Sequence, residues 1–179
     1  FPEIDVPMSL IEEANQHADV AIITIHRYSR EVFDRSSEKG DFYLTDIEQK
    51  MVDDVTAAFE HSIIVLDIGS MMDVSWIKSN PKIDAALIAW QAGMEGGLAI
   101  ADILCGDVNP SGSLVDTYCY DNYSSPAMVN FTPITYNGDK KGIVPENAST
   151  YMIYQEGIYV GYKYYETRYE DYVMGTGNA

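Results

Sequence analysis

Three short apolar runs, rich in β-branched residues, constrain the fold of this chain more than any other feature. They read VAIITI at 20–25, IIVLDIG at 63–69 and IDAALIAW at 83–90. A strand with one wet face alternates apolar and polar residues, whereas these runs are almost continuously apolar. Segments with helical character separate them. The pattern therefore predicts strands covered by helices on both faces, in a three-layer α/β/α sandwich with a mostly parallel central sheet.

Two helix starts carry a capping-box signal, in which side chains satisfy the free amides of the first turn. One is Ser9 with Glu12, and the other is Thr45 with Glu48. After the second, apolar residues recur at helical spacing, so we expect a helix over 45–60. The apolar residues of that helix are Ile47, Met51, Val55 and Phe59. The remaining expected elements are a short helix near 73–79, a helix over 95–105 and a strand near 114–119.

The periodic pattern stops near residue 120, where Pro, Asn, Gly and Tyr become frequent, and it returns only at 156–166. We therefore expect residues 1–120 to form the sandwich core, with a long loop at 26–43. Residues 121–179 should form an irregular, Tyr-rich extension of the same domain that adds an edge strand near 157–165. The chain begins without Met and ends in GTGNA without a finishing element, so we expect it to be part of a longer protein.

Composition excludes several classes of function. The chain has 11 basic and 28 acidic residues and a net charge of −17, which disfavours binding to nucleic acid or to an anionic membrane surface. No apolar run approaches the roughly 20 residues of a membrane span. Two cysteines and three histidines follow no metal-binding pattern, so we expect no metal and no cofactor. The acidic balance and the lack of a disulfide pattern are compatible with the cytoplasm.

The loop that follows the first apolar run is unusually long and charged. Within RYSREVFDRSSEKGDFYLTDIE at 27–48, four acids and four bases precede the expected helix. Ligands of parallel α/β sheets gather at the carboxyl ends of the strands, where this loop leaves the sheet. Glu31, an acid held among arginines there, could serve in general acid/base chemistry. The charges could equally form ion pairs that only order the loop.

Two other segments have a functional and a structural interpretation. Gly93, Gly96 and Gly97 lie between a strand and a helix, where a phosphate-binding loop would lie, but they match neither G-x-G-x-x-G nor a Walker loop. A tight turn with close helix packing explains them better. The Tyr-rich stretch 151–172 could stack on sugars, although aromatic residues packed in a strand are the favoured interpretation.

The run IAWQAGMEGGLAIADILCGDVNPSGSL at 88–114 resembles the signature of the second, α/β sandwich domain of glycoside hydrolase family 3, the β-glucosidase group. That signature reads approximately W-Q-P-G-Q-E-G-G-x-A-x-A-D-V-L-F-G-D-V-N-P-S-G-K-L. Three further stretches agree in order, at 20–35, 39–48 and 156–166. The resemblance covers most of residues 14–168. Its departures include Ala92 and Met94 in place of Pro and Gln.

The resemblance implies a function for the long loop. In multidomain members, a loop of this domain similar to R-x-S-x-E-x-x-D-R carries the general acid/base, and a separate barrel domain supplies the aspartate nucleophile. The motif falls here on Arg27, Ser29, Glu31, Asp34 and Arg35, followed by Lys39, Gly40 and Asp41. Glu31 would then be the acid/base. The other charged residues of the motif and Ser29 would line the site or support the loop.

The resemblance thus implies the acid/base domain of a retaining β-glycosidase, most similar to β-glucosidases, whose barrel domain is missing from this chain. Its substrates would be β-linked oligosaccharides or aryl glucosides, and the chain alone would be inactive. One alternative is a non-catalytic sugar-binding or domain-interface module. Another is a doubly wound domain that binds a phosphorylated ligand at 93–97.

Overall fold

The chain divides into two compact units, which we describe separately. A computed structural model describes residues 3–28, 35–131, 133–136, 149–169 and 171. The N-terminal unit comprises residues 1–113 and the C-terminal unit comprises residues 114–179. The division therefore falls a few residues before the expected boundary at 120.

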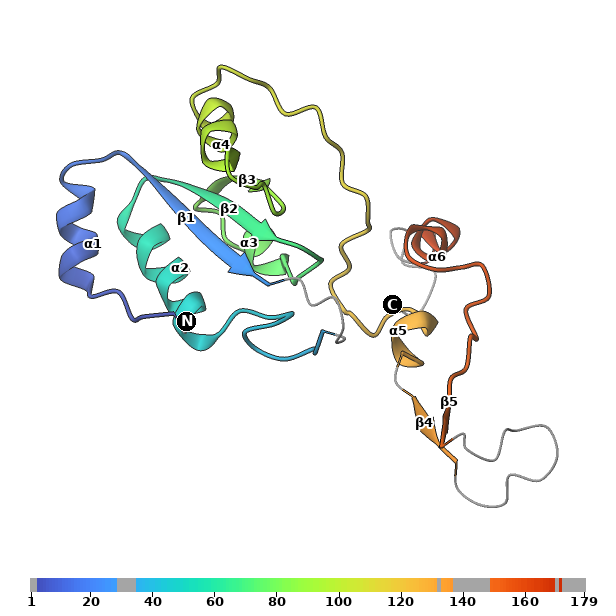
Figure 1. The fold of residues 1–179 in the computed structure, drawn as a ribbon. Coiled ribbons are helices and arrows are strands. Elements are labelled where there is room, and N and C mark those ends of the chain that lie inside the picture. Colours follow the sequence, from blue (N-terminus) through green and yellow to red (C-terminus); the bar gives the residue numbers. More distant parts are fainter. Residues whose placement is uncertain (1–2, 29–34, 132, 137–148, 170, 172–179) are drawn as a thin grey trace. The chain divides into compact units, whose positions relative to one another are not determined.

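The N-terminal unit is built on a parallel sheet with strand order β1-β2-β3 (Figure 1). Its strands are β1 (Val20–Arg27), β2 (His61–Ile68) and β3 (Ile83–Ile88). All three match the apolar runs predicted to be strands. In the register, Val20 lies opposite His61 and Arg27 lies opposite Ile68, so the carboxyl ends of β1 and β2 are level with each other.

Helices lie on both faces of this sheet, as predicted. They are α1 (Met8–Asn15), α2 (Asp46–Ala58), α3 (Ser75–Ser79) and α4 (Gly96–Leu104). Val52 of α2 and Trp76 of α3 belong to one buried cluster with Ile23 and Ile25 of β1, so α2 and α3 cover the same face. Figure 1 shows α4 on the other side of the sheet from α1 and α2. The unit is thus a three-layer α/β/α sandwich.

The core lies between β2 and the helices of the α2 face. Ile64 and Ile68 of β2 and Val52 of α2 are fully buried. A second, smaller cluster joins α1 to the sheet through Ile11, Ala21 and Phe59. Because β2 is the central strand of the described sheet and is buried along most of its length, it fixes the positions of the loops that leave the sheet beside it.

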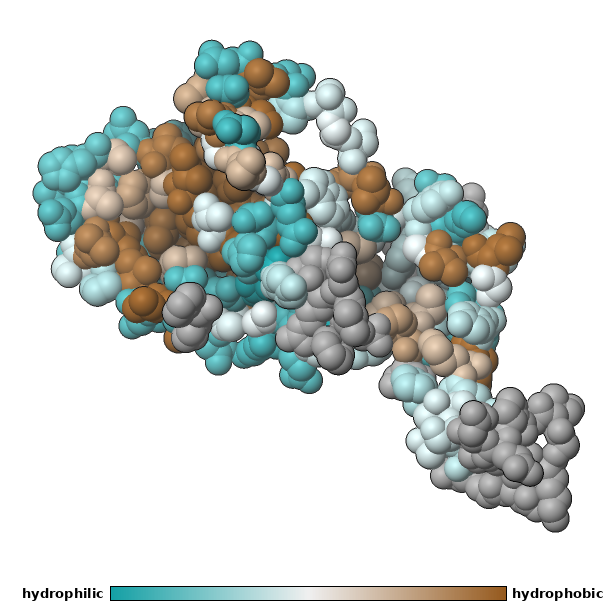
Figure 2. Space-filling model, viewed as in Figure 1, coloured by the Kyte–Doolittle hydropathy of each residue, from teal (hydrophilic) through white to brown (hydrophobic). Residues whose placement is uncertain are grey.

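The prediction that all three strands are buried on both faces is wrong for two of them in the part of the chain that the structure describes. β3 has no buried residue, and β1 is buried on one face only. Its side chains alternate between exposed and buried, and Val20 and Ile22 are 44% and 54% exposed. Figure 2 shows apolar surface gathered over the sheet between α1 and α4. The physical reason is the placement of the helices, because α1, α2 and α3 all pack against the opposite side of the sheet.

One of the two predicted capping boxes is confirmed. The Thr45 hydroxyl accepts a hydrogen bond from the Glu48 backbone N–H at 3.1 Å, and the Glu48 carboxylate accepts one from the Thr45 N–H at 2.8 Å. The box at Ser9 is wrong. There, α1 begins at Met8 after Pro7, whose φ of −62° already suits a helix start, and no side chain caps it.

The C-terminal unit contains short elements. They are α5 (Pro126–Val129), the antiparallel pair β4 (Ile134–Thr135) and β5 (Thr150–Tyr151), and α6 (Tyr162–Thr167). The predicted strands at 114–119 and 157–165 are both wrong. Gly157 and Gly161 have φ values of +57° and +58°, which interrupt an extended chain, and the tyrosines after Gly161 form α6. No described helix in either unit has the length and apolar composition needed to cross a bilayer.

The start of α4 explains one of the glycines between 93 and 97. A Cβ atom built on Gly96 would lie 2.4 Å from the Cβ atom of Ala92, whereas one built on Gly97 meets no atom within 4 Å. Gly96 therefore permits the tight approach of the preceding turn to the helix. Gly97 has no such role.

We predict opposite effects for two matched substitutions at this turn. Gly96→Ala should lower the free energy of unfolding by about 1–3 kcal/mol, because the Ala92 backbone must move. Gly97→Ala should leave stability unchanged or raise it by up to about 1 kcal/mol, because alanine favours helix. Urea denaturation followed by circular dichroism measures both. Equal effects of the two substitutions would contradict the close-packing explanation.

Candidate active site

Arg27 ends β1 with its side chain buried and every guanidinium N–H bonded. It is 6% exposed. Its two Nη atoms each donate to one oxygen of Glu48, both at 2.6 Å, and Nη1 also donates to the His26 carbonyl at 2.8 Å. Nη2 reaches the Tyr43 carbonyl at 3.3 Å, and Nε reaches the Asp41 carbonyl at 3.0 Å. Paired, planar bonding of this kind fixes the orientation of the guanidinium as well as its position.

Glu48 joins this ion pair to the first turn of α2. The oxygen that accepts from Arg27 Nη2 also accepts from the Thr45 N–H in the capping box. One buried carboxylate therefore caps the helix and neutralises Arg27. The sequence signal predicted only the first of these roles, because the capping-box pattern is local and Arg27 lies 21 residues away.

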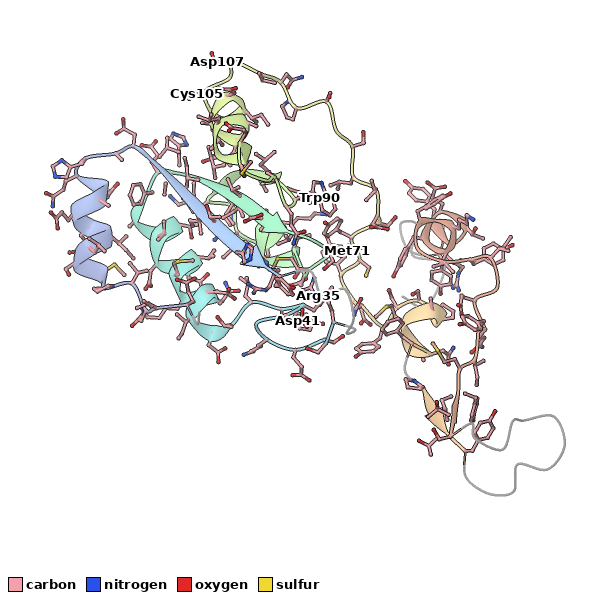
Figure 3. The ribbon with its side chains drawn as sticks, viewed as in Figure 1. Arg35, Asp41, Met71, Trp90, Cys105 and Asp107 are labelled. Atoms are coloured by element: carbon pink, nitrogen blue, oxygen red, sulfur yellow. The ribbon has the colours of Figure 1, made fainter. Side chains whose placement is uncertain are left out.

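Arg35 lies within the loop at 26–43 and is anchored on its own set of oxygens. Its Nε donates to Asp41 Oδ1 and its Nη2 to the Asp41 carbonyl, each at 2.5 Å. Its Nη1 donates to Ser70 Oγ at 2.5 Å and to the Met71 carbonyl at 2.6 Å, just after β2. Figure 3 shows Arg35, Asp41 and Met71 together beside the carboxyl ends of the strands.

Asp41 is the residue on which both arginines converge. Its carbonyl oxygen accepts from Arg27 Nε and from Arg35 Nη2. Its carboxylate also accepts from the backbone N–H and the hydroxyl of Ser36, at 2.8 and 3.1 Å. Positions 27 and 35 are thereby tied to one peptide group, and the base of the segment between them is fixed.

The environment lowers the pKa values of both carboxylates. Burial alone would raise the pKa of Glu48, but the hydrogen bonds from Arg27 and Thr45, together with the Arg27 charge, outweigh it and hold that pKa below its usual range. Burial likewise opposes ionisation of Asp41. Hydrogen bonds from Ser36 and Arg35, and the charge of Arg35, nevertheless lower the pKa of Asp41.

The structure brings together three of the predicted site residues and separates a fourth. Arg27, Arg35 and Asp41 form the anchor just described. Lys39 lies on the surface, 65% exposed in its side chain, and its Nζ contacts Asp46 Oδ1 at 2.5 Å. The three other predicted residues lie outside the described residues: Ser29, Glu31 and Asp34.

A cavity of about 400 Å³ lies on the other face of the sheet, and it gives no support to phosphate binding. Gly93, Gly96 and Gly97 line it together with Asp67, and none of its described lining residues is Lys or Arg. At its edge, His26 Nδ1 lies 2.9 Å from Asp67 Oδ2. Among the described residues, no group of three or more His, Cys, Asp or Glu side chains is placed to hold a metal ion.

Comparison with protein-family models matches residues 7–162 to the glycosyl hydrolase family 3 C-terminal domain. The chain belongs to this family, as its C-terminal domain. The resemblance seen in the sequence is thereby confirmed. The described anchor residues of this family 3 domain all fall within the matched range.

Proteins similar to this chain in sequence or in structure are β-glucosidases, in agreement with the family match. The domain is 36% identical to β-glucosidase A of Butyrivibrio fibrisolvens, over 90% of this chain and 20% of the relative. A β-glucosidase from Paenibacillus barengoltzii matches with a TM-score of 0.79 and 32% identity, over 92% of this chain and 17% of that one. β-Glucosidase 3B from Thermotoga neapolitana matches with a TM-score of 0.75 and 36% identity, over 93% and 22%. The chain thus spans about a fifth of the length of these proteins.

The lowered pKa values predict that acid destabilises the family 3 domain. Carboxylates with a folded-state pKa below the unfolded value contribute stability that is complete above about pH 5 and is lost as the pH falls through about 4 and below. Glu48→Gln should reduce the free energy of unfolding at neutral pH by about 3 kcal/mol, because it leaves a buried guanidinium without its counter-charge. The free energy of unfolding of this variant should also depend less on pH than that of the wild-type protein.

Urea denaturation between about pH 7 and pH 3 measures both effects. Glu12→Gln, which removes an exposed acid of α1, is the matched control for the loss of one negative charge. Parallel pH curves for the wild-type protein and Glu48→Gln would contradict the assignment of acid sensitivity to the Arg27–Glu48 pair.

Proposed function

We propose that this domain carries the general acid/base of a retaining β-glucosidase and that Glu31 is that residue. Glu31 lies in the segment whose two ends, Arg27 and Arg35, converge on the Asp41 carbonyl. This convergence is the observation that carries the proposal. A loop at the carboxyl end of a parallel sheet needs such a base if it is to hold a catalytic carboxyl in a set position.

The named relatives support the reaction class. The matched proteins are β-glucosidases, and this chain covers only about a fifth of the length of each. The nucleophilic aspartate belongs, in this proposal, to a barrel domain outside the chain. Terminal β-linked glucosides are the proposed substrates, and the domain by itself is inactive.

The proposed reaction has two steps, and Glu31 changes its role between them. In the first, the protonated Glu31 gives its proton to the glycosidic oxygen as the aspartate attacks the anomeric carbon, so the aglycone leaves and a glycosyl-enzyme ester forms. In the second, the Glu31 carboxylate takes a proton from water, which attacks the same carbon and releases the sugar and the aspartate.

The test uses the full-length parent protein with aryl β-glucosides that carry either a good or a poor leaving group. Glu31→Gln should lower kcat/KM for the poor leaving group by about 100- to 10,000-fold, because that group needs protonation to leave. It should change kcat/KM little for the good one. The kcat for the good substrate should fall, because water is no longer activated, and azide should restore it with a glycosyl azide as product.

Glu38→Gln is the matched control, because Glu38 is an exposed acid of the same connection. It should behave as the wild-type enzyme does with both substrates. Wild-type kinetics for Glu31→Gln would assign the acid/base elsewhere. Such a result would favour the non-catalytic interpretation of the loop.

A further inference from the structure

We propose that Glu48 is a positioning residue for the reaction: it acts through Arg27 to hold the loop that carries the acid/base. This inference rests on the proposed function of Glu31. Glu48 lies outside the loop motif, in the first turn of α2, and its side chain is 7% exposed. Within the described residues, only its hydrogen bonds to Arg27 connect Glu48 to the site.

The first step is the geometry of the Arg27–Glu48 pair. Two parallel N–H···O bonds of 2.6 Å fix the plane of the Arg27 guanidinium. With that plane fixed, Nε points at the Asp41 carbonyl and Nη2 at the Tyr43 carbonyl. The Glu48 carboxylate therefore decides which way the remaining donors of Arg27 face.

The second step is what happens at the base of the loop when the carboxylate loses its charge. The Arg27 side chain is 6% exposed, and a buried guanidinium without its counter-charge should move toward water. Its bonds to the carbonyls of Asp41 and Tyr43 are then lost. Arg35 still holds Asp41 through its own bonds, and the pairing of β1 with β2 still holds the Arg27 backbone, but the bond that ties Arg27 to the Asp41 peptide group is gone.

The third step separates positioning from simple stabilisation. Well-packed apolar residues stabilise a fold as well as a buried ion pair does, and sometimes better. Apolar residues in place of the pair would not donate to the Asp41 carbonyl. The contribution that only the ion pair makes is therefore the orientation of Arg27, and through it the bond between the end of β1 and the Asp41 peptide group.

The kinetic consequence is specific to acid/base chemistry. A displacement of about 1 Å at a reacting group lowers the rate by up to about 100-fold. In the full-length parent protein, Glu48→Gln should therefore lower kcat/KM for an aryl β-glucoside with a poor leaving group by about 10- to 100-fold. It should change kcat/KM little for a good leaving group, and azide should raise the reduced kcat on that substrate. A loss of folded protein alone would lower the rates on both substrates equally.

Thr45→Ala is the matched control for helix capping. It removes the hydroxyl that accepts from the Glu48 N–H but leaves the carboxylate on Arg27. Both Thr45→Ala and Glu48→Gln weaken the first turn of α2. Only Glu48→Gln should change the dependence on the leaving group. Glu48→Asp, which keeps the charge on a shorter side chain, should recover part of the loss on the poor substrate.

A double variant covers the case in which Glu48→Gln does not fold. Arg27→Met with Glu48→Leu replaces both charges by apolar side chains and should fold. It should still show the selective loss on the poor leaving group, because nothing at position 27 donates to Asp41. Wild-type leaving-group dependence in this folded variant would overturn the inference.

Parallel assays of Glu31→Gln distinguish the two ways of failing. If Glu31→Gln shows the acid/base pattern and the folded Glu48 variants do not, the positioning role is wrong and the proposed function stands. If Glu31→Gln itself behaves as the wild-type enzyme does, the proposed function fails, and the positioning role fails with it.

Discussion

The described site depends on one buried charge, the Arg27 guanidinium at the carboxyl end of β1. A cation in that position must be neutralised and fully hydrogen-bonded, and Glu48 together with three carbonyl groups meets both requirements. This requirement ties a strand, a helix start and the returning chain at Asp41 to one another. The same pair through which we predict acid sensitivity also bonds the end of β1 to the returning chain at Asp41.

The parallel sheet determines the position of the anchor formed by Arg27, Arg35 and Asp41. β1 and β2 run parallel and end level, so the segments that follow them start side by side. Arg35 uses this arrangement when it bonds to Ser70 and Met71 after β2 and to Asp41 before α2. The described residues on either side of 29–34 are therefore supported from two strands and one helix, which is the kind of base that the proposed role of Glu31 would need.

The parts of the fold that repeat along the chain could be predicted from the sequence. Continuous β-branched runs gave the three strands, and a Thr–x–x–Glu pattern before apolar residues at helical spacing gave the start of α2. The strand predicted at 157–165 is wrong. The prediction relied on the β propensity of the tyrosines, but Gly157 and Gly161 adopt positive φ values that a sequence does not reveal. In the site, the motif located Arg27, Arg35 and Asp41. Glu48 was missed as their partner, because a contact across 21 residues leaves no periodic signal.

The most direct test of the central claim is the structure of the full-length parent protein trapped as its covalent glycosyl-enzyme with a 2-fluoro glucoside. The quantity to measure is the separation between the Glu31 carboxyl group and the aspartate that bears the sugar. The proposed function predicts a separation of about 5 Å, as a retaining mechanism requires. A separation beyond about 10 Å, with another carboxyl group nearer the anomeric carbon, would contradict the assignment of the acid/base to this domain.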